Sequence, residues 1–405
     1  MAELHLLSPA GFRAGAVYAG IKSKQTPDVA LLICDRPAAA AAVFTTNKVI
    51  AAPVTIGRAH IASGKLRGVV VNAGNANACT GRQGEKDARR MCAIAAKLVD
   101  CEPKEILPSS TGIIGHLMPM DKIEMGIRGA AAGLGSDLHH ALHFSDAILT
   151  TDTRRKSASA RFRTKKGTGV ISGVCKGSGM IGPRMALPAK PIHATMLAYL
   201  TTDAAISAPL LRKLLSAASE ASFNAVTVDD HTSTNDTACI MASGLSAKID
   251  SVADTASFAR ALEEVCQSLA YQIAADGEGA TKVVTISVRQ AKDDLSARVI
   301  ARTIANSPLV KCAMHGNDPN WGRIVSAAGM AGVPFDPERC TLTLQGAVVF
   351  RAGQPVRFDA QKVSRSLAAP EVKIELTCKL GTGAASCWTC DLSKDYVTIN
   401  ADYHT

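Results

Sequence analysis

The spacing of apolar residues along this chain changes several times between the pattern of strands and the pattern of helices. Val29–Cys34 and Arg67–Asn72 are apolar runs typical of strands, whereas Gly84–Cys101 has its apolar residues at helical spacing. Strand-like alternation returns over Gly167–Met180. The pattern therefore predicts a fold of mixed sheets and helices.

The second half of the chain continues this mixture. Several prolines interrupt Pro183–Pro191, which is predicted to hold no regular element. Ala208–Phe223 and Thr255–Ala275 have the clearest amphipathic pattern of helices. The remaining predictions are a strand at Lys282–Arg289, a helix at Asp294–Ser307 and short strands joined by turns over Cys340–Tyr403. We expect a smaller C-terminal unit that begins near residue 285.

The composition predicts a soluble, cytosolic protein with two or three folding units. The chain has 405 residues, of which 47% are hydrophobic, so it has ample material for a core. No apolar run approaches the roughly 18 to 20 residues that span a bilayer, and Met1–Tyr18 lacks the continuous apolar stretch of an export signal. The twelve cysteines are scattered, which favours reduced thiols over disulfides. Cys387 and Cys390 form one C-x-x-C pair, which is weak support for a metal or redox site.

The formal net charge of +10 raises the question of nucleic-acid binding. The basic residues are dispersed, however, with the densest groups at 154–156 and 161–166, and only 4% of residues are aromatic. A solvated surface that steers anionic substrates is therefore the better interpretation.

Common catalytic motifs do not fit this sequence. Gly177, Gly179 and Gly182 match the glycine pattern of dinucleotide-binding loops, but Pro183 follows at once, where that motif needs the start of a helix. The ten histidines suggest neither a Ser-His-Asp triad nor a metal site.

What remains is a set of short runs rich in glycine, serine, threonine and asparagine. Each run alone is typical of a turn or a cap. In order along the chain they are Asn72-Ala-Gly-Asn-Ala-Asn77, Ser110-Thr-Gly112, Thr150-Thr-Asp-Thr153, Lys176-Gly-Ser-Gly-Met-Ile181, Ala194-Thr-Met-Leu-Ala-Tyr199, Thr232-Ser-Thr-Asn-Asp-Thr237, Asp276-Gly-Glu-Gly-Ala-Thr-Lys282, Asp318-Pro-Asn-Trp-Gly-Arg323 and Asn400-Ala-Asp-Tyr403. Taken together and in this order, they resemble the ornithine acetyltransferase family of arginine biosynthesis.

The resemblance implies a self-processing fold of the N-terminal-nucleophile type. In that α+β class, layered sheets are flanked by helices, here with a smaller α/β domain at the C-terminus. Family members cut their own backbone before a threonine, which corresponds to the bond between Ala194 and Thr195. The expected products are an alpha chain, 1–194, and a beta chain, 195–405, whose core part is 195–284 and whose smaller domain is 285–405. The cut chains are expected to assemble as α2β2.

The same resemblance implies the chemistry and the residues that perform it. Thr195 would be the nucleophile, and Thr111 and Gly112 would form the oxyanion hole. Thr150, Lys176, Thr195, Glu278, Asn400 and Thr405 match the family's substrate-binding positions. The implied reaction moves acetyl from N-acetylornithine to glutamate, needs no metal or organic cofactor and involves no nucleic acid or membrane. Some relatives also use acetyl-CoA, and no residue in this sequence separates the two kinds.

Several alternatives remain open at this stage. Judged singly, Thr195 is a typical helix N-cap, Glu278 a turn residue, Lys176 the end of a surface strand and Thr405 a frayed terminus. An aminopeptidase or amidase of the same fold, or an uncut chain without catalysis, would also fit the pattern.

The sequence departs from the family pattern in three places. Residues 187–194 are an apparent insertion just before the bond to be cut. Asp230 stands where the family has a glycine in an Asp-Gly-Asp run, and His315-Gly-Asn317 replaces the usual Phe-Gly-Ala. An altered approach to the scissile bond could relieve strain that self-cleavage needs.

Overall fold

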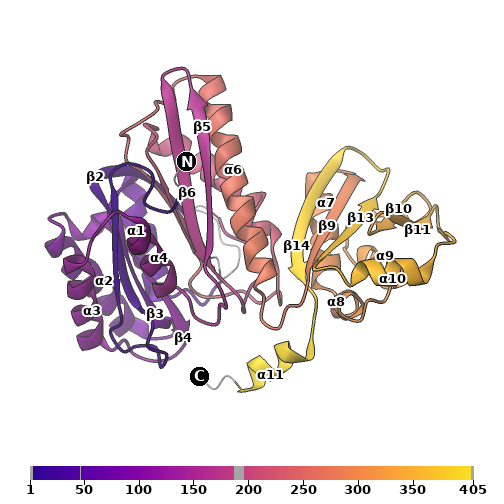
Figure 1. Ribbon diagram of the computed structural model, residues 1–405, viewed down its shortest axis with the longest axis horizontal. Helices are drawn as coiled ribbons and strands as arrows, with labels where there is room; N and C mark the ends of the chain where they lie inside the picture. The colour runs from indigo at the N-terminus through magenta and orange to yellow at the C-terminus, as the bar shows by residue number, and fades with distance from the viewer. Residues whose placement is uncertain (1–2, 46, 187–195, 403–405) are drawn as a thin grey trace. The chain divides into compact units, whose positions relative to one another are not determined.

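The computed structural model describes residues 3–45, 47–186 and 196–402, which divide into two compact units (Figure 1). The first unit comprises most of the chain up to Leu269. The second comprises Ala225–Asp230 and the chain from Ala270 onward. It starts earlier than residue 285 because the last turn of a long helix belongs with it. The division into chains 1–194 and 195–405 concerns cleavage and stays a prediction.

The first unit is built on one eight-stranded sheet in the order β4-β3-β2-β8-β7-β6-β5, with β1 paired to β2. Its strands are β1 (Phe12–Val17), β2 (Val29–Phe44), β3 (Lys65–Asn75), β4 (Ile106–Ile113), β5 (Lys156–Thr164), β6 (Gly167–Lys176), β7 (Leu197–Thr202) and β8 (Thr237–Ala242). Its helices are α1 (Ala52–His60), α2 (Gly81–Leu98), α3 (Met120–Ala132), α4 (Leu138–Ala147), α5 (Ala208–Glu220) and α6 (Val252–Ala275), with 3-10 helices η1 (Ile61–Ser63), η2 (Pro103–Glu105) and η3 (Phe223–Ala225).

The long strand β2 changes its partners along its length and so divides the sheet into two halves. Its first residues, Val29–Ile33, pair with β3, and its last residues, Ala39–Phe44, pair with β8. The register shifts between Ile33 and Ala38. A bulge of this kind bends the strand and re-aims the chain that follows.

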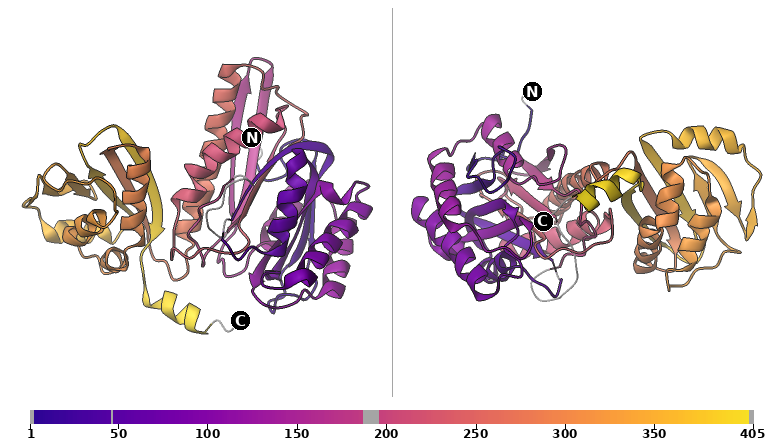
Figure 2. Two further views of the ribbon diagram at one scale, coloured as in Figure 1. Left: turned by 180° about the vertical axis from the view of Figure 1, so that it is seen from behind. Right: turned by 90° about the horizontal axis from the view of Figure 1, so that it is seen from below.

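Successive side chains along the strands point to opposite faces of the sheet, so each face is covered by its own layer of packed residues. Leu32 and Val69 belong to one buried cluster with Leu197 and Tyr199, which come from the other half of the sheet. Their neighbours Leu31 and Val70 point the other way, into a cluster with Met91 of α2 and Ile123 of α3. On the other half, the Cys175 thiol reaches the Leu269 carbonyl of α6, which runs along β5 and β6 (Figures 1 and 2). This confirms layered sheets flanked by helices.

The second unit contains a six-stranded sheet in the order β12-β11-β10-β13-β9-β14. Its strands are β9 (Val283–Ala291), β10 (Thr341–Leu344), β11 (Ala347–Arg351), β12 (Gln354–Pro355), β13 (Glu371–Thr377) and β14 (Gly383–Cys390). Its helices are α7 (Asp294–Asn306), α8 (Pro308–His315), α9 (Trp321–Gly329), α10 (Ala360–Leu367) and α11 (Lys394–Asp402). Alternate residues of β9, such as Ile286 and Val288, share one core with Ile300 and Ile304 of α7.

The sequence-based elements are confirmed for the long segments and wrong for part of the C-terminal region. The expected helices at 208–223, 255–275 and 294–307 correspond to α5, α6 and α7. The stretch 340–403 was expected to contain strands and turns only, yet it holds α10 and α11. In α10 only Val363 and Leu367 are buried, and α11 buries none of its residues. Helix α11 therefore leaves no buried apolar face to be recognised, and α10 is only eight residues long, with a single pair of buried apolar residues four positions apart.

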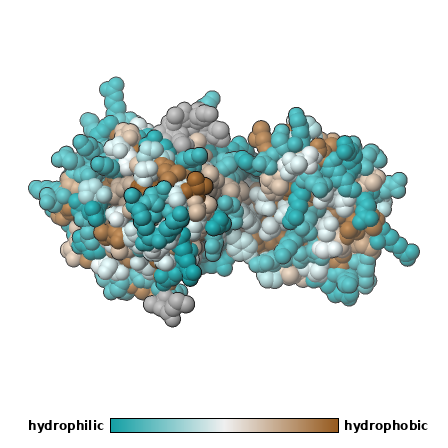
Figure 3. Space-filling model, turned by 90° about the horizontal axis from the view of Figure 1, so that it is seen from above, coloured by the Kyte–Doolittle hydropathy of each residue, from teal (hydrophilic) through white to brown (hydrophobic). Residues whose placement is uncertain are grey.

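None of the helices in the described ranges is both long enough and apolar enough to cross a membrane. The face drawn in Figure 3 is largely hydrophilic, with its hydrophobic residues in small separate groups.

Candidate active site

Three of the short polar runs meet around the end of β4. The side-chain amide of Asn235 donates to the backbone oxygens of Ala76, at 2.6 Å, and Ser110, at 2.8 Å. The hydroxyl of Ser110 donates to Asn72 Oδ1 at 2.6 Å. These buried bonds fix the backbone immediately before Thr111. Asn235 and Asn72 were seen in the sequence as parts of motifs, but no role had been assigned to them.

Gly112 occupies a position that only glycine can fill. Its φ is +130°, and a Cβ added there would lie 2.4 Å from the backbone carbon of Gly74 and 2.6 Å from the nitrogen of Asn75. Non-glycine residues are strained at such a φ, and the neighbouring atoms belong to the backbone of β3, which cannot move aside cheaply. The close approach therefore holds the Gly112 backbone in one orientation, as an oxyanion hole requires.

Thr111 and Lys176 are brought together by the fold, although 65 residues separate them. Both side chains are buried, and Lys176 Nζ donates to Thr111 Oγ1 at 3.3 Å. An ammonium can only donate, so the threonine oxygen accepts this bond and its own proton can be offered to another acceptor. A developing negative charge beside Thr111 would thus meet a hydroxyl donor with a cation directly behind it. The interpretation of Lys176 as the end of a surface strand is wrong.

Asp152 fixes the end of β6, where Lys176 lies. Its fully buried carboxylate accepts from Lys156 Nζ at 2.7 Å and from the Gly177 backbone N–H at 2.6 Å. Burial alone would raise the pKa of Asp152, but the charges of Lys176 and Lys156 outweigh it and lower that pKa to about 2. Lys156 was expected on a solvated surface and is instead completely buried, because Asp152 compensates its charge.

The strand that follows the expected cleavage point lies beside Lys176. Lys176 is in register with Leu197 of β7, and Leu197 with Thr237 of β8. Met196 is fully buried, and its carbonyl accepts from the Thr237 N–H. Since the segment after position 195 is a strand, the alternative that Thr195 is a helix N-cap is wrong. Ala194 and Thr195 themselves, like the insertion 187–194, lie outside the described residues.

Asp236 is a buried acid that nothing in the sequence distinguishes beyond its place in a motif. The side chain is fully buried, and neither carboxyl oxygen has a hydrogen-bond partner among the described residues. Burial raises the pKa of Asp236 well above its usual range, which makes the neutral acid the favoured form. Its neighbour Thr237 is the residue that bonds to Met196.

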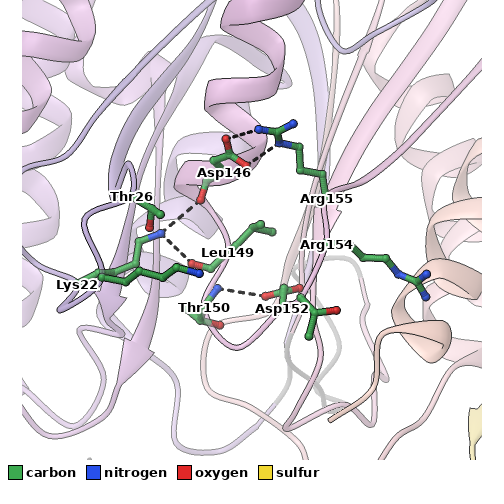
Figure 4. A pocket seen from close by; sticks show the side chains of 10 residues that line it. Lys22, Thr26, Asp146, Leu149, Thr150, Asp152, Arg154 and Arg155 are labelled. Carbon is green, nitrogen blue, oxygen red and sulfur yellow. Dashed lines mark hydrogen bonds and ion pairs between the residues drawn. The ribbon is translucent and has the colours of Figure 1, made fainter. Parts of the chain in front are cut away.

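Thr150 lines a pocket of about 440 Å³ in the first unit (Figure 4). Its backbone N–H donates to Asp152 Oδ2 at 3.1 Å, so the pocket shares Asp152 with the Lys176 region. Thr150 was expected to bind substrate, and an open pocket at this position is compatible with that role. Of the basic side chains in the same pocket, Arg154 and Arg155 belong to a basic group seen in the sequence, whereas nothing in its sequence context distinguishes Lys22.

Glu278 and Asn400 meet in the second unit. Asn400 Nδ2 donates to Glu278 Oε2 at 2.9 Å. Gly279 has a φ of +68°, and an added Cβ would lie 2.4 Å from the Tyr396 nitrogen, so only glycine lets this loop approach the start of α11. Ser393 Oγ closes the contact by donating to the Gly279 carbonyl at 2.6 Å. Glu278 lies in a turn and makes one exposed hydrogen bond, to Asn400, so its role in binding substrate stays a prediction. Thr405 lies outside the described residues.

The loop that carries Glu278 is tied down by Asp391. This buried carboxylate accepts from the backbone N–H groups of Thr281 and Lys282 at 2.8 and 2.9 Å and lies 2.7 Å from His315 Nδ1. Burial alone would raise the pKa of Asp391, but these hydrogen bonds lower it. Asn317 bonds to Lys282 Nζ, so both residues that depart from the usual family run take part in this network.

The departure at Asp230 is accommodated without loss of the turn. Asp230 has a φ of +53°, the left-handed conformation that a glycine would adopt there, and aspartate tolerates it better than most residues. Its carboxylate also pairs with Arg302 at 3.0 Å.

The glycine-rich segment and the cysteines were also interpreted from the sequence. No helix begins after Gly177–Gly182 within the described part of that segment, which agrees with the rejection of dinucleotide binding. None of the twelve cysteines, which all lie in the described ranges, forms a disulfide, and nine of them are buried. Among the residues with described positions, no group of three or more histidines, cysteines and acids could hold a metal.

Comparison with known proteins places these observations in one family. The ArgJ family model matches residues 13–405. The arginine biosynthesis bifunctional protein ArgJ of Rhodopirellula baltica is 44% identical over 99% of this chain and 97% of its own. A solved structure of that protein from Bacillus halodurans is 40% identical, with a TM-score of 0.49 over 50% of this chain and 97% of that one. Ornithine acetyltransferase from Mycobacterium tuberculosis, solved with ornithine, is 36% identical, with a TM-score of 0.41 over 45% of this chain and 96% of that one. On the family match and the full-length identity, the chain belongs to the ArgJ family.

Proposed function

We propose that this protein transfers an acetyl group from N-acetylornithine to glutamate, with Thr195 as the residue that carries the acetyl group. The observation that supports it most is the contact of buried Thr111, which precedes Gly112, with buried Lys176. Lys176 lies in register with the start of β7, the strand that follows Thr195 in the chain. The relatives named for arginine biosynthesis support the same pathway for this chain.

Cleavage between Ala194 and Thr195 would give Thr195 a free α-amine next to its hydroxyl. An α-amine has a pKa of about 7.7 to 8.0, so a useful fraction is neutral near pH 7 and can accept the hydroxyl proton. The nucleophile then carries its own base, which explains why no histidine triad is needed.

The reaction would proceed in two halves. The Thr195 oxygen attacks the acetyl carbonyl of N-acetylornithine, and the resulting oxyanion is stabilised by the Thr111 hydroxyl and the Gly112 N–H. The C–N bond breaks, ornithine leaves after its nitrogen takes up the proton, and an acetyl ester remains on Thr195. The α-amine of glutamate then attacks this ester, which releases N-acetylglutamate and restores the hydroxyl.

The remaining expected residues would bind substrate. Lys176 suits the α-carboxylate that both substrates share, and Thr150 donates to Asp152, the carboxylate that also binds the Gly177 N–H next to Lys176. Glu278 suits the side-chain ammonium of ornithine, with Asn400 and Thr405 assigned by family resemblance. Assembly as α2β2, a cytosolic location and independence of any cofactor are likewise proposals that rest on the resemblance. So is the use of acetyl-CoA as a second donor.

The test measures ornithine and N-acetylglutamate in mixtures of the protein, N-acetylornithine and glutamate. Equal amounts of both products are expected, and Thr111→Val should lower the rate about a hundred- to a thousandfold. Thr168→Val, on the exposed start of β6, is the matched control and should keep the wild-type rate. Release of ornithine and free acetate at a rate independent of glutamate would contradict the proposal and identify an amidase. Replacing N-acetylornithine by acetyl-CoA in the same assay tests the second donor.

A further inference from the structure

The pocket beside Thr150 carries an excess of positive charge. It has a volume of about 440 Å³, and Figure 4 shows Lys22 directed toward the backbone of Asp146 and Leu149, with Arg155 against the Asp146 side chain. Its charged lining residues are Lys22, Lys24, Asp146, Asp152, Arg154 and Arg155. Four cations therefore face two carboxylates.

Both carboxylates already have cationic partners. Arg155 binds Asp146 through two parallel hydrogen bonds of 2.6 and 2.7 Å. Asp152 is paired with the buried Lys156 at 2.7 Å. Bidentate and buried pairs of this kind largely cancel their charges locally. Within the described residues, no ion pair joins Lys22 or Lys24 to an acid. The more distant charges of Asp28, Asp146 and Asp152 only partly offset burial, which lowers the pKa of Lys22.

Lys22 is held in place by a buried framework. The carboxylate of Asp28, which is completely buried, accepts from the backbone N–H groups of Ala19, Ile21 and Lys22 at 2.6, 2.7 and 3.1 Å. Lys22 Nζ donates to the carbonyls of Asp146 and Leu149 at 3.3 and 3.0 Å (Figure 4). These two acceptors are neutral, and an ammonium has three donors. Burial lowers the pKa of Lys22 to about 8, so an anion in the pocket would restore favourable conditions for its charge.

The proposed reaction creates a need for such a cation. Ornithine and glutamate both present an α-amine and an α-carboxylate, but their side chains end in opposite charges. The side-chain carboxylate of glutamate needs a cationic partner that the side-chain ammonium of ornithine does not. The pocket offers such a cation and shares Asp152 with the Lys176 region.

We propose that this pocket binds the side-chain carboxylate of the acyl acceptor, with Lys22 as its principal charge partner. The inference rests on the proposed acetyl transfer for the identity of the acceptor. Its test is a binding measurement, so that the two can fail separately.

Titration calorimetry would compare N-acetylglutamate with N-acetylglutamine, which has the same shape but no side-chain charge. Wild-type protein should bind N-acetylglutamate more tightly. Lys22→Gln should weaken the binding of N-acetylglutamate about ten- to a hundredfold, the range expected for a hydrogen bond to a charged group. Its affinity for N-acetylglutamine should stay within about twofold of wild type. Glutamine keeps a donor for the carbonyls of Asp146 and Leu149. Lys97→Met, on the exposed end of α2, is the control and should bind like wild type.

Any of three results would overturn the proposal. The wild-type protein could bind the two ligands with equal affinity. Lys22→Gln could keep the wild-type preference for N-acetylglutamate, or it could lose affinity for both ligands equally. The last would mean that Lys22 only supports the local structure, and thermal melting of the variant would show this independently. If the charge-dependent binding is found but no acetyl transfer occurs, the pocket stands and the proposed reaction fails.

Discussion

Substitution of Gly112 by alanine tests whether the backbone at the proposed oxyanion hole is held by its close approach to β3. The added methyl would lie 2.4 Å from the Gly74 carbonyl carbon, 2.6 Å from the Asn75 nitrogen and 2.7 Å from the Gly74 Cα. All three are backbone atoms of one strand, so no side chain can rotate away to make room.

The size of the effect follows from these distances. Carbon atoms in contact prefer about 3.5 Å or more, so β3 and β4 must separate by about 1 Å at this point. A displacement of about 1 Å at a reacting centre can cost about a hundredfold in rate, and loss of one oxyanion donor about a hundred- to a thousandfold. The positive φ adds strain of about 1–3 kcal/mol to the folded state. We therefore expect kcat to fall by at least about a hundredfold together with a lower melting temperature.

Gly115→Ala separates the two effects. Gly115 also has a positive φ, +91°, but an added Cβ there meets no atom within 4 Å. This variant should be destabilised by backbone strain and keep most of its activity. The assay records initial rates of ornithine release, the extent of chain cleavage on a gel and the melting temperature of each variant. Activities of Gly112→Ala and Gly115→Ala within about threefold of each other would refute the reasoning.

Three further predictions concern buried carboxylates. Asp152→Asn leaves Lys156 buried without its counter-charge, which should cost about 3–5 kcal/mol. The pKa of Asp152 is about 2 in the folded state, below the value of about 3.9 in the unfolded state. The loss of unfolding free energy, measured by urea titration, should therefore be complete above pH 4 and shrink toward pH 2. A loss that does not change with pH would contradict the pairing. Because the pKa of Asp236 is raised in the folded state, its contribution to stability is present below about pH 4 and is lost as the pH rises. The melting temperature of Asp236→Asn relative to wild type should therefore be higher at pH 8 than at pH 5. The same difference from wild type at both pH values would count against a neutral buried acid. Asp391→Ala removes the acceptor of the Thr281 and Lys282 N–H groups and should raise the KM for N-acetylornithine. His315→Phe leaves those two bonds in place and should change the KM little. Equal effects of the two variants would argue that Asp391 does not position Glu278.

The sequence predicted the elements whose burial is periodic and missed those whose burial is slight. Helix α7 buries Ile300, Ile304 and their neighbours at helical spacing and was expected from that spacing. Helix α11 buries nothing and left no such signal. Likewise, the division of the sheet at the bend of β2 depends on a register shift between Ile33 and Ala38 that apolar content alone does not reveal.

The site was foreseen where residues lie in distinctive motifs, and not where partners come from distant segments. Thr111, Gly112 and Lys176 were expected and are close together, as are Glu278 and Asn400. The burial of Lys156 could not be foreseen, because it depends on Asp152 taking a particular place within the fold. Lys22 carries no motif at all, and its position follows from the hydrogen bonds that Asp28 makes with the backbone around it.

The intact mass of the purified protein tests the central claim most directly. Self-cleavage before Thr195 predicts two fragments, one that ends at Ala194 and one that begins at Thr195, with the α-amine of Thr195 found by N-terminal sequencing. Thr195→Ala should remain one chain and lack activity. A wild-type protein that stays a single chain of 42.2 kDa and still transfers acetyl would contradict the account.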